Sequence, residues 1–238
     1  MARCMSGAIR VDTLPAEKIE TSADSDLISA DEMELFLRSK RSCRRYKDKT
    51  VEKEVLERLL DIAQAAPTAM NSLEKTFIVI RDSDKIDELR KAVLKESKKT
   101  YSFVRFFAGR FGSLIFPKET VTAFKHFEID FQLLFKHAAN GNDPLFHSAP
   151  CIVLFTGIGM DANGKDNALA AMHYFMIQAE TMGLGTCING FSSTLPKVLA
   201  KVVKVPRFHK IFGVVTLGYS ASKFPKTACR KSPESQWL

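Results

Sequence analysis

The sequence predicts a layered globular fold of the α/β or α+β class, in which helices and strands alternate along the chain. Three apolar runs of strand length, with many β-branched residues, occur at residues 76–82, 149–157 and 211–219. Segments with helical periodicity lie between these runs. Buried strands interleaved with helices pack as layers around one core, and a chain of 238 residues can bury such a core as one domain.

The N-terminal part of the chain predicts an irregular leader followed by a helix. Residues 1–28 have mixed polarity and no sustained period, so we expect the main domain to span residues 29–238. Ser29 is followed three residues later by Glu32, which is the spacing of a capping box. A helix is therefore expected to begin directly after Ser29.

Two amphipathic helices are predicted on either side of the first strand. Residues 50–66 carry apolar side chains at helical spacing, with Thr50 as the expected N-cap and Pro67 as the end. Residues 83–99 show the same period. The stretch after Pro67 is polar and reads as a loop.

Residues 100–147 are unusually rich in phenylalanine. Four of these side chains recur at helical spacing, Phe124, Phe127, Phe131 and Phe135. Such a stripe is typical of a helix that faces the core or another subunit, and an aromatic wall over a flat ligand is the alternative.

The C-terminal half predicts two further helices. Residues 166–182 form a long apolar helical segment that Gly183 terminates at the C′ position. Residues 183–191 are punctuated by glycine and predict a turn. Residues 194–203 predict a short helix with Thr194 as its cap.

The composition restricts the cellular setting and the partners. The formal net charge is +8 and the isoelectric point is about 9.2, which suits a polyanionic partner or simple solubility. Five cysteines are scattered without a C-x-x-C pair, which argues against a zinc site and suits a reducing compartment. No apolar run approaches the roughly 20 residues that a membrane span requires, and the first residues lack the apolar core of a signal peptide. We therefore expect a cytoplasmic protein with no membrane partner.

Two sequence features suggest alternative functions. Residues 159–166, GMDANGKD, nearly match a P-loop, but Asp166 stands where a hydroxyl should hold magnesium, and a polar turn explains the stretch equally well. Residues 38–49 concentrate cations before a helix, which fits a solvated surface, a nucleic-acid module or one phosphate group. A short linear cluster suits a single phosphate better than a polymer track. The five histidines show no metal-ligand spacing, so no metal site is expected.

Five segments in order resemble one family, the FMN-dependent nitroreductases. These are KRSCRRY (residues 40–46), AAPTAMNS (65–72), SAPCIVLF (148–155), the helix and turn of residues 166–191, and the basic C-terminal stretch of residues 211–233. The resemblance implies an α+β fold, a three-layer α-β-α sandwich. It also implies an intertwined homodimer that exchanges C-terminal arms and holds two FMN molecules at the subunit interface.

The resemblance also implies which residues contact FMN. Lys40, Arg41 and Arg44 match the family's phosphate-binding positions, with Ser42 as a hydroxyl donor, and Arg44 also lies near flavin N1. The remaining expected contacts are Pro67, Thr68, Ala69 and Asn71 at the ribityl chain and pyrimidine edge, Ile188, Asn189 and Gly190 at N5, and Lys226 and Arg230 at the phosphate.

The implied activity is hydride transfer from NAD(P)H through flavin N5 to a nitroaromatic, quinone or similar acceptor, with the cofactor supplying the reactive atoms. A non-nitro substrate or a flavin-holding role stays open. The chain departs from the family at residues 73–75, LEK, where Q-P-W is frequent, and this difference concerns substrate preference. Residues 4–12 resemble the end of a ferredoxin motif, but only Cys4 of the ligands is present, so no iron-sulfur cluster is expected.

Overall fold

The computed structural model describes residues 28–110 and 118–238. The chain divides into two units, residues 40–225 and a unit whose described part is residues 28–39 and 226–238. The smaller unit contains helix α1 (Ala30–Ser39). Its predicted capping box is confirmed, because the Ser29 hydroxyl donates to the Glu32 carboxylate at 2.6 Å and the Glu32 N–H donates to the Ser29 hydroxyl at 3.3 Å. The predicted leader, except its last residue, lies outside the described residues.

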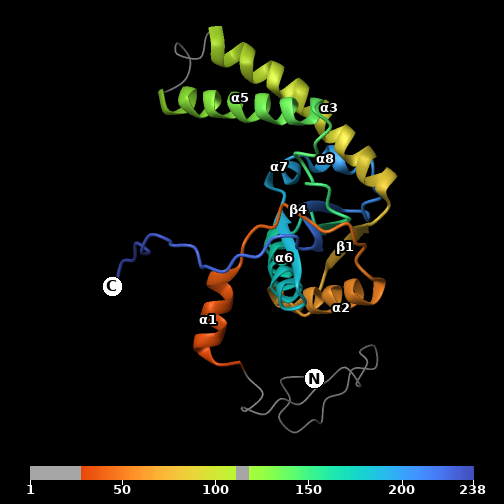
Figure 1. Cartoon of the computed structure of the whole chain (residues 1–238), viewed down its shortest axis with the longest axis vertical. Coiled ribbons are helices and arrows are strands. Elements are labelled where there is room, and N and C mark those ends of the chain that lie inside the picture. Colours follow the sequence, from red (N-terminus) through yellow and green to blue (C-terminus); the bar gives the residue numbers. More distant parts are fainter. Residues whose placement is uncertain (1–27, 111–117) are drawn as a thin grey trace. The chain divides into compact units, whose positions relative to one another are not determined.

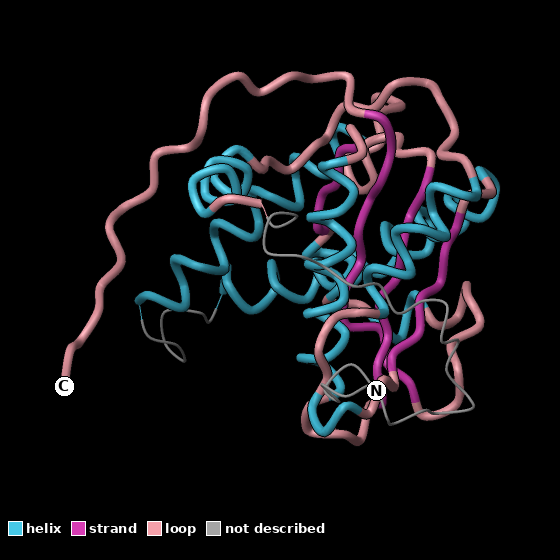
Figure 2. The backbone as a smooth tube through the Cα atoms, turned by 90° about the horizontal axis from the view of Figure 1, so that it is seen from below, coloured by secondary structure: helices cyan, strands magenta, loops and turns pink. Residues whose placement is uncertain are grey.

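The unit of residues 40–225 is built on one sheet of antiparallel strands (Figures 1 and 2). Its strand order is β1-β2-β4-β3. The sheet joins strands that are far apart in the chain. β2 pairs antiparallel with β1 on one side and with β4 on the other. Three of the strands match the predicted apolar runs. The strands are β1 (Lys75–Ile80), β2 (Cys151–Ile158), β3 (Leu184–Ile188) and β4 (His209–Tyr219).

Strand β3 corrects the prediction of a turn across residues 183–191. Its residues pair in register with β4, from Leu184 opposite Tyr219 to Ile188 opposite Val215. The glycine that made the segment look like a turn has a packing role, because a Cβ on Gly185 would lie 2.5 Å from the Cys43 sulfur. Only Gly183, with a φ of +73°, has a turn conformation here.

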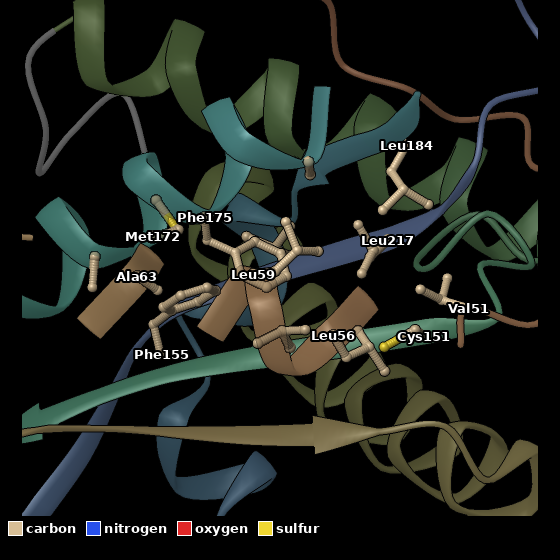
Figure 3. Packing of buried hydrophobic residues seen from close by; sticks show 14 of the residues in the cluster. Val51, Leu56, Leu59, Ala63, Cys151, Phe155, Met172, Phe175, Leu184 and Leu217 are labelled. Carbon is tan, nitrogen blue, oxygen red and sulfur yellow. The ribbon is translucent and has the colours of Figure 1, made fainter. Parts of the chain in front are cut away.

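One face of the sheet is covered by helices α2 (Lys53–Gln64) and α6 (Gly164–Thr181). Alternate residues of β2 point to this face, as the period of a strand requires. Phe155 packs against Phe175 of α6 with ring centroids 5.4 Å apart, and Leu59 of α2 lies in the same cluster (Figure 3). The predicted N-cap of α2 was wrong by two residues, since Glu52 rather than Thr50 holds that position.

The opposite face is covered by α3 (Ser83–Arg110) and by α8 (Pro196–Leu199). The intervening residues of β2, Ile152 and Leu154, point to this side. Helices on both faces of the sheet make three layers, so the structure confirms the α+β three-layer architecture. The predicted cap at Thr194 was wrong, because α8 begins after Leu195.

Helix α3 extends beyond its predicted end near residue 99 and pairs with α5 (Lys118–Ala139), which runs back alongside it (Figure 1). Tyr101 of α3 packs against Phe131 and Phe135 of α5, with centroid distances of 5.9 and 5.6 Å. The aromatic stripe therefore joins two helices. In the described ranges, no helix is both long and apolar enough to cross a membrane.

Candidate functional site

A cavity of about 300 Å³ opens beside the C-terminal end of β3. Its walls come from the segment before α2, from α5, from the loop that precedes β2, and from the turn between β3 and α7 (Gly190–Ser193). Most of the lining is apolar, with a few polar groups directed at the same space, which is typical of a ligand site. The lining residues are Arg44, Phe127, Asp130, Phe131, Leu134, Pro144, Leu145, His147, Cys187, Ile188, Asn189, Gly190, Phe191 and Thr216.

Arg44 is placed at the cavity by an extended segment that runs along the sheet. The Cys43 N–H donates to the Thr186 carbonyl at 2.9 Å, and the Tyr46 hydroxyl lies 2.7 Å from both the Cys43 carbonyl and Thr216 Oγ1. Cys43 and Tyr46 thus point inward, and the two arginines between them, Arg44 and Arg45, are exposed. Burial raises the pKa of Tyr46, so it remains a neutral hydrogen-bonding anchor.

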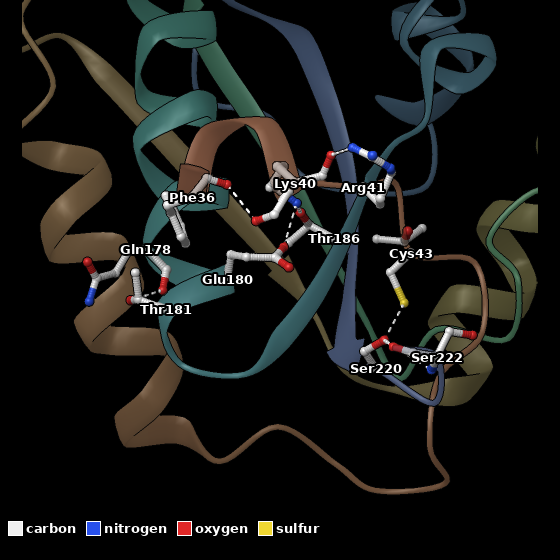
Figure 4. A network of polar contacts seen from close by, with 12 residues as sticks. Phe36, Lys40, Arg41, Cys43, Gln178, Glu180, Thr181, Thr186, Ser220 and Ser222 are labelled. Carbon is white, nitrogen blue, oxygen red and sulfur yellow. Dashed lines mark hydrogen bonds and ion pairs between the residues drawn. The ribbon is translucent and has the colours of Figure 1, made fainter. Parts of the chain in front are cut away.

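The other basic residues of this segment have different surroundings (Figure 4). The Lys40 ammonium donates to Thr186 Oγ1 at 2.8 Å and pairs with the Glu180 carboxylate at 3.0 Å. Arg41 donates to the Lys40 carbonyl at 2.8 Å, and Ser42 is exposed. These three residues therefore lie along the edge of β3, outside the cavity lining.

Asn189 holds the turn at the end of β3. Its backbone N–H donates to the Val214 carbonyl at 2.8 Å, its side-chain oxygen accepts from the Ser192 N–H at 2.8 Å, and its side-chain amide donates to the Leu145 carbonyl at 2.6 Å. The residue is 8% exposed. Because its amide groups are committed internally, Asn189 positions the cavity wall and offers a ligand little hydrogen bonding of its own.

Gly190 contributes a backbone group to the cavity. It is the first residue of α7, and the N–H groups at a helix start have no partner inside the helix. A Cβ on Gly190 would meet nothing within 4 Å, so a ligand can approach this backbone closely.

The loop before β2 brings His147 to the cavity. The Asp143 carboxylate accepts from the N–H groups of Leu145, Phe146 and Ser148 at 3.1, 2.9 and 3.1 Å. His147 and Ser148 have φ values of +58° and +55°, a region that non-glycine residues occupy at a cost. The loop thus presents His147 in a backbone conformation that three hydrogen bonds to one carboxylate support.

The charge state of His147 follows from its surroundings. Burial lowers the pKa of His147, the positive charge of Arg44 lowers it further, and Asp143 opposes both effects. A pKa below the usual value of 6.5 leaves the imidazole neutral at pH 7. His147 can therefore offer the cavity a hydrogen bond without adding charge.

The predicted contacts at residues 67–71 lie in a separate loop, outside the cavity lining. Pro67 and Asn71 are exposed, whereas Thr68 and Ala69 are half-buried. The Ala69 N–H donates to Asn167 Oδ1 at 3.0 Å, and the Leu73 N–H donates to Thr68 Oγ1 at 3.1 Å.

Several residues of this loop have strained backbones. Met70, Asn71 and Leu73 have φ values of +51°, +53° and +56°. Strain of this kind often marks functional segments. Two other predicted contacts, Lys226 and Arg230, lie in the C-terminal segment of the smaller unit, which has no regular secondary structure.

The structure therefore brings together four of the predicted residues, Arg44, Ile188, Asn189 and Gly190. The alternative reading of the aromatic stripe, a wall over a flat ligand, agrees with the place of Phe127 and Phe131 in the lining. Sequence reasoning assigned no site residue in the loop at residues 143–148. The helical spacing of Phe127 and Phe131 indicated a shared face, but nothing local assigned Asp130 or His147 to it. Among the described residues, no group of three or more His, Cys, Asp and Glu side chains could hold a metal ion.

The P-loop-like stretch at residues 159–166 has a packing explanation. A Cβ on Gly157 would lie 2.2 Å from the Gly164 carbonyl oxygen, and a Cβ on Gly164 would lie 2.1 Å from the Ile158 carbonyl oxygen. The glycines therefore let the start of α6 approach the end of β2. Between them, Asp161 accepts from the Asn163 N–H at 3.0 Å in a tight polar turn.

Comparisons with known proteins agree with this architecture. The sequence profile described as the Nitroreductase family matches residues 37–219. No curated protein shows a significant sequence match.

Solved structures of similar fold were also found. A nitroreductase with bound FMN from Bacteroides fragilis NCTC 9343 is 19% identical, with a TM-score of 0.65 over 87% of this chain and 98% of its own. One with bound FMN from Desulfitobacterium hafniense DCB-2 is 16% identical, with a TM-score of 0.60 over 85% and 97%. A putative NADH oxidase from Clostridium acetobutylicum is 20% identical, with a TM-score of 0.54 over 83% and 94%. At these identities, the likeness shows the fold.

Proposed function

Because the chain belongs to the nitroreductase family, we propose that it is an FMN-dependent oxidoreductase that passes hydride from NAD(P)H to a small acceptor such as a nitroaromatic or a quinone. The observation that carries this proposal is the cavity where Arg44 meets the turn at Ile188, Asn189 and Gly190. A cation can stabilise the negative charge of a reduced flavin, and a backbone N–H can donate to its N5 atom. The scattered cysteines suit the cytoplasm as the proposed location.

The chain's own groups fit FMN at two points. Gly190 is exposed at the start of α7, where helix N–H groups have no partner inside the helix, so its N–H suits a hydrogen bond to flavin N5. The guanidinium of Arg44 is exposed at the cavity and suits the pyrimidine edge, where negative charge collects on reduction. Bound FMN would supply the two-electron hydride chemistry, while these residues orient it and stabilise its charge.

The distribution of the remaining predicted contacts supports a homodimer. Arg44 and the turn at residues 188–190 lie at the cavity, whereas the loop at residues 67–71 lies elsewhere on the same chain. In a dimer with a two-fold axis, one patch of the first subunit can contact a different patch of the second, and the same contact then occurs a second time in the reverse direction. We therefore propose that the loop of one subunit completes the FMN site of the other, with Lys226 and Arg230 as further phosphate contacts.

The two alternative functions receive less support. In the P-loop-like stretch, Gly164 is explained by the close approach of α6 to the end of β2. Several cations of the basic stretch are paired within the chain, since Lys40 pairs with Glu180 and Lys49 with Glu52, both at 3.0 Å. Paired cations release fewer counterions on binding a polyanion.

The proposal is tested by titrating purified protein with FMN and recording flavin fluorescence and absorption. Replacing Arg44 with Ala should weaken FMN binding about tenfold or more, because a hydrogen bond to a charged group is worth roughly 1.5–3 kcal/mol. Arg45→Ala is the matched control, since Arg45 is its exposed neighbour and does not line the cavity.

Turnover is measured as oxidation of NADH or NADPH with an added quinone or nitroaromatic acceptor. Protein that stays colourless after reconstitution with FMN would contradict the proposal. A protein that binds FMN but oxidises neither nicotinamide would restrict the proposal to a flavin-holding role or to another electron donor.

A further inference from the structure

In the described lining of the cavity, the part that α5 and Phe191 contribute carries one acidic side chain among aromatic rings. Asp130 of α5 lines the cavity, and Phe127, Phe131 and Phe191 line it as well. Phe131 and Phe191 pack edge to face with their centroids 5.6 Å apart, which joins α5 to α7. Within the described residues, no cation lies within ion-pairing distance of the Asp130 carboxylate.

We propose that this wall selects electron acceptors that are flat, aromatic and positively charged, with Asp130 as the counter-ion. A carboxylate favours a cation over a neutral isostere, and aromatic faces add cation–π attraction. The inference rests on the proposed function, which assigns Arg44 and the turn to FMN and leaves the α5 wall to the acceptor.

The other ionisable groups around the cavity do not cancel this preference. His147 is neutral at pH 7 because burial and Arg44 lower its pKa. The Asp143 carboxylate already accepts three backbone hydrogen bonds in its own loop. Among the described residues of the lining, Arg44 is the one arginine or lysine, and the proposed function places it against FMN. Cys187 completes the titratable groups of the lining.

The test compares trimethyl(4-nitrobenzyl)ammonium with its uncharged carbon isostere, 4-nitroneopentylbenzene. The dissociation constant of each compound for the FMN-loaded protein is measured by calorimetry, so the readout does not require turnover. The selectivity is the constant for the neutral compound divided by that for the cation. Asp130→Asn should lower this selectivity about fivefold, the upper range for an exposed charge pair.

Glu128→Gln is the matched control. Glu128 lies two residues earlier on α5, is half-buried and does not line the cavity. Its replacement removes the same charge from the same helix, so the selectivity should stay as in the unmodified protein. An equal loss of selectivity in both variants would show that only the overall charge matters, and it would overturn the inference. An unchanged selectivity in Asp130→Asn would also overturn it.

A second measurement uses pH. Protonation of His147 adds a positive charge to the cavity, and because its pKa is lowered below 6.5, this happens only at pH values below 6.5. The contribution of His147 to the selectivity should therefore stay constant between pH 8 and pH 7, and the selectivity for the cation should fall as the pH is lowered further. His147→Gln should remove most of that fall, and an identical pH profile in this variant would overturn the role of His147 as the neutral neighbour. Failure of the protein to take up FMN would instead refute the proposed function, and the inference with it.

Discussion

Gly190 shows how a single residue connects the fold to the proposed chemistry. It opens a short helix at the end of β3 and lies in open space, so its backbone is accessible to a ligand. The neighbouring Asn189 is buried and uses its side chain to tie this turn to Leu145 and Ser192. One residue therefore stabilises the turn, while the next presents a donor.

Replacing Gly190 with Pro tests the donor directly. Proline is accepted at the first position of a helix but has no N–H, so this change removes the hydrogen bond and retains the fold. We expect FMN to bind with an affinity lowered by about tenfold or less, and we expect the flavin reduction potential to change. Fluorescence titration measures the affinity and spectroelectrochemical titration measures the potential. Gly190→Ala keeps the N–H and adds only a Cβ, so it should change both less than Gly190→Pro.

At the scale of elements, close backbone contacts decide how the layers pack. The start of α6 lies against the end of β2 at Gly157 and Gly164, where no side chain fits. The same principle applies at Gly185 of β3, which lies against Cys43. These glycines allow backbone elements to approach, so they contribute to the core rather than to loop flexibility.

Gly164→Ala should destabilise the protein by about 2 kcal/mol, because the new Cβ would overlap the Ile158 carbonyl oxygen and the backbone has to move. Urea unfolding measures the free energy of unfolding. Gly159→Ala is the control, since its Cβ would meet only the flexible side chain of Lys210. Equal stability of the two variants would contradict the packing role of Gly164.

A pH-sensitive contact joins the start of α2 to β4. The Tyr219 hydroxyl donates to the Glu52 carboxylate at 2.5 Å, and Lys49 lies 3.0 Å from the same carboxylate. These hydrogen bonds lower the pKa of Glu52 to about 2, and the one from Tyr219 has the largest effect. A lowered carboxyl pKa stabilises the fold above the unfolded value near 4.5, and this contribution is lost as the pH falls towards 2.

Tyr219→Phe should therefore lower the urea midpoint at pH 7, and the difference from the unmodified protein should shrink as the pH falls from 4.5 to 2.5. Tyr174→Phe serves as the control, because Tyr174 is an exposed residue of α6. A difference that stays constant across this range would show that the Glu52 contact does not contribute to stability.

At the scale of the whole molecule, the proposed homodimer can be followed through the single tryptophan. Trp237 lies in the C-terminal segment and is 92% exposed in this chain. If this segment crosses to a partner subunit, Trp237 becomes buried there. Dilution should then shift its emission to longer wavelength, with the same midpoint as dimer dissociation measured by sedimentation. An emission maximum that is independent of concentration would contradict arm exchange at this residue.

The sequence by itself determined the elements whose signals are local. Helical periodicity predicted α2, α6 and the start of α3, and apolar runs predicted three of the four strands. The motif at residues 40–46 and the turn at residues 188–190 located one side of the cavity. The helices and strands followed from spacing within short segments, which is the information that a single chain displays directly. The side of the cavity followed from the resemblance to the nitroreductase family.

Only the tertiary structure decided the features that depend on distant partners. Strand β3 exists because β4 supplies its hydrogen bonds, although its glycines resemble a turn. The cavity combines Asp130 of α5 with His147 and with the turn near Asn189, which lie far apart in sequence. The pairing of distant strands and the burial of a neutral histidine depend on surroundings that exist only in the folded chain. The local sequence pattern therefore does not predict them.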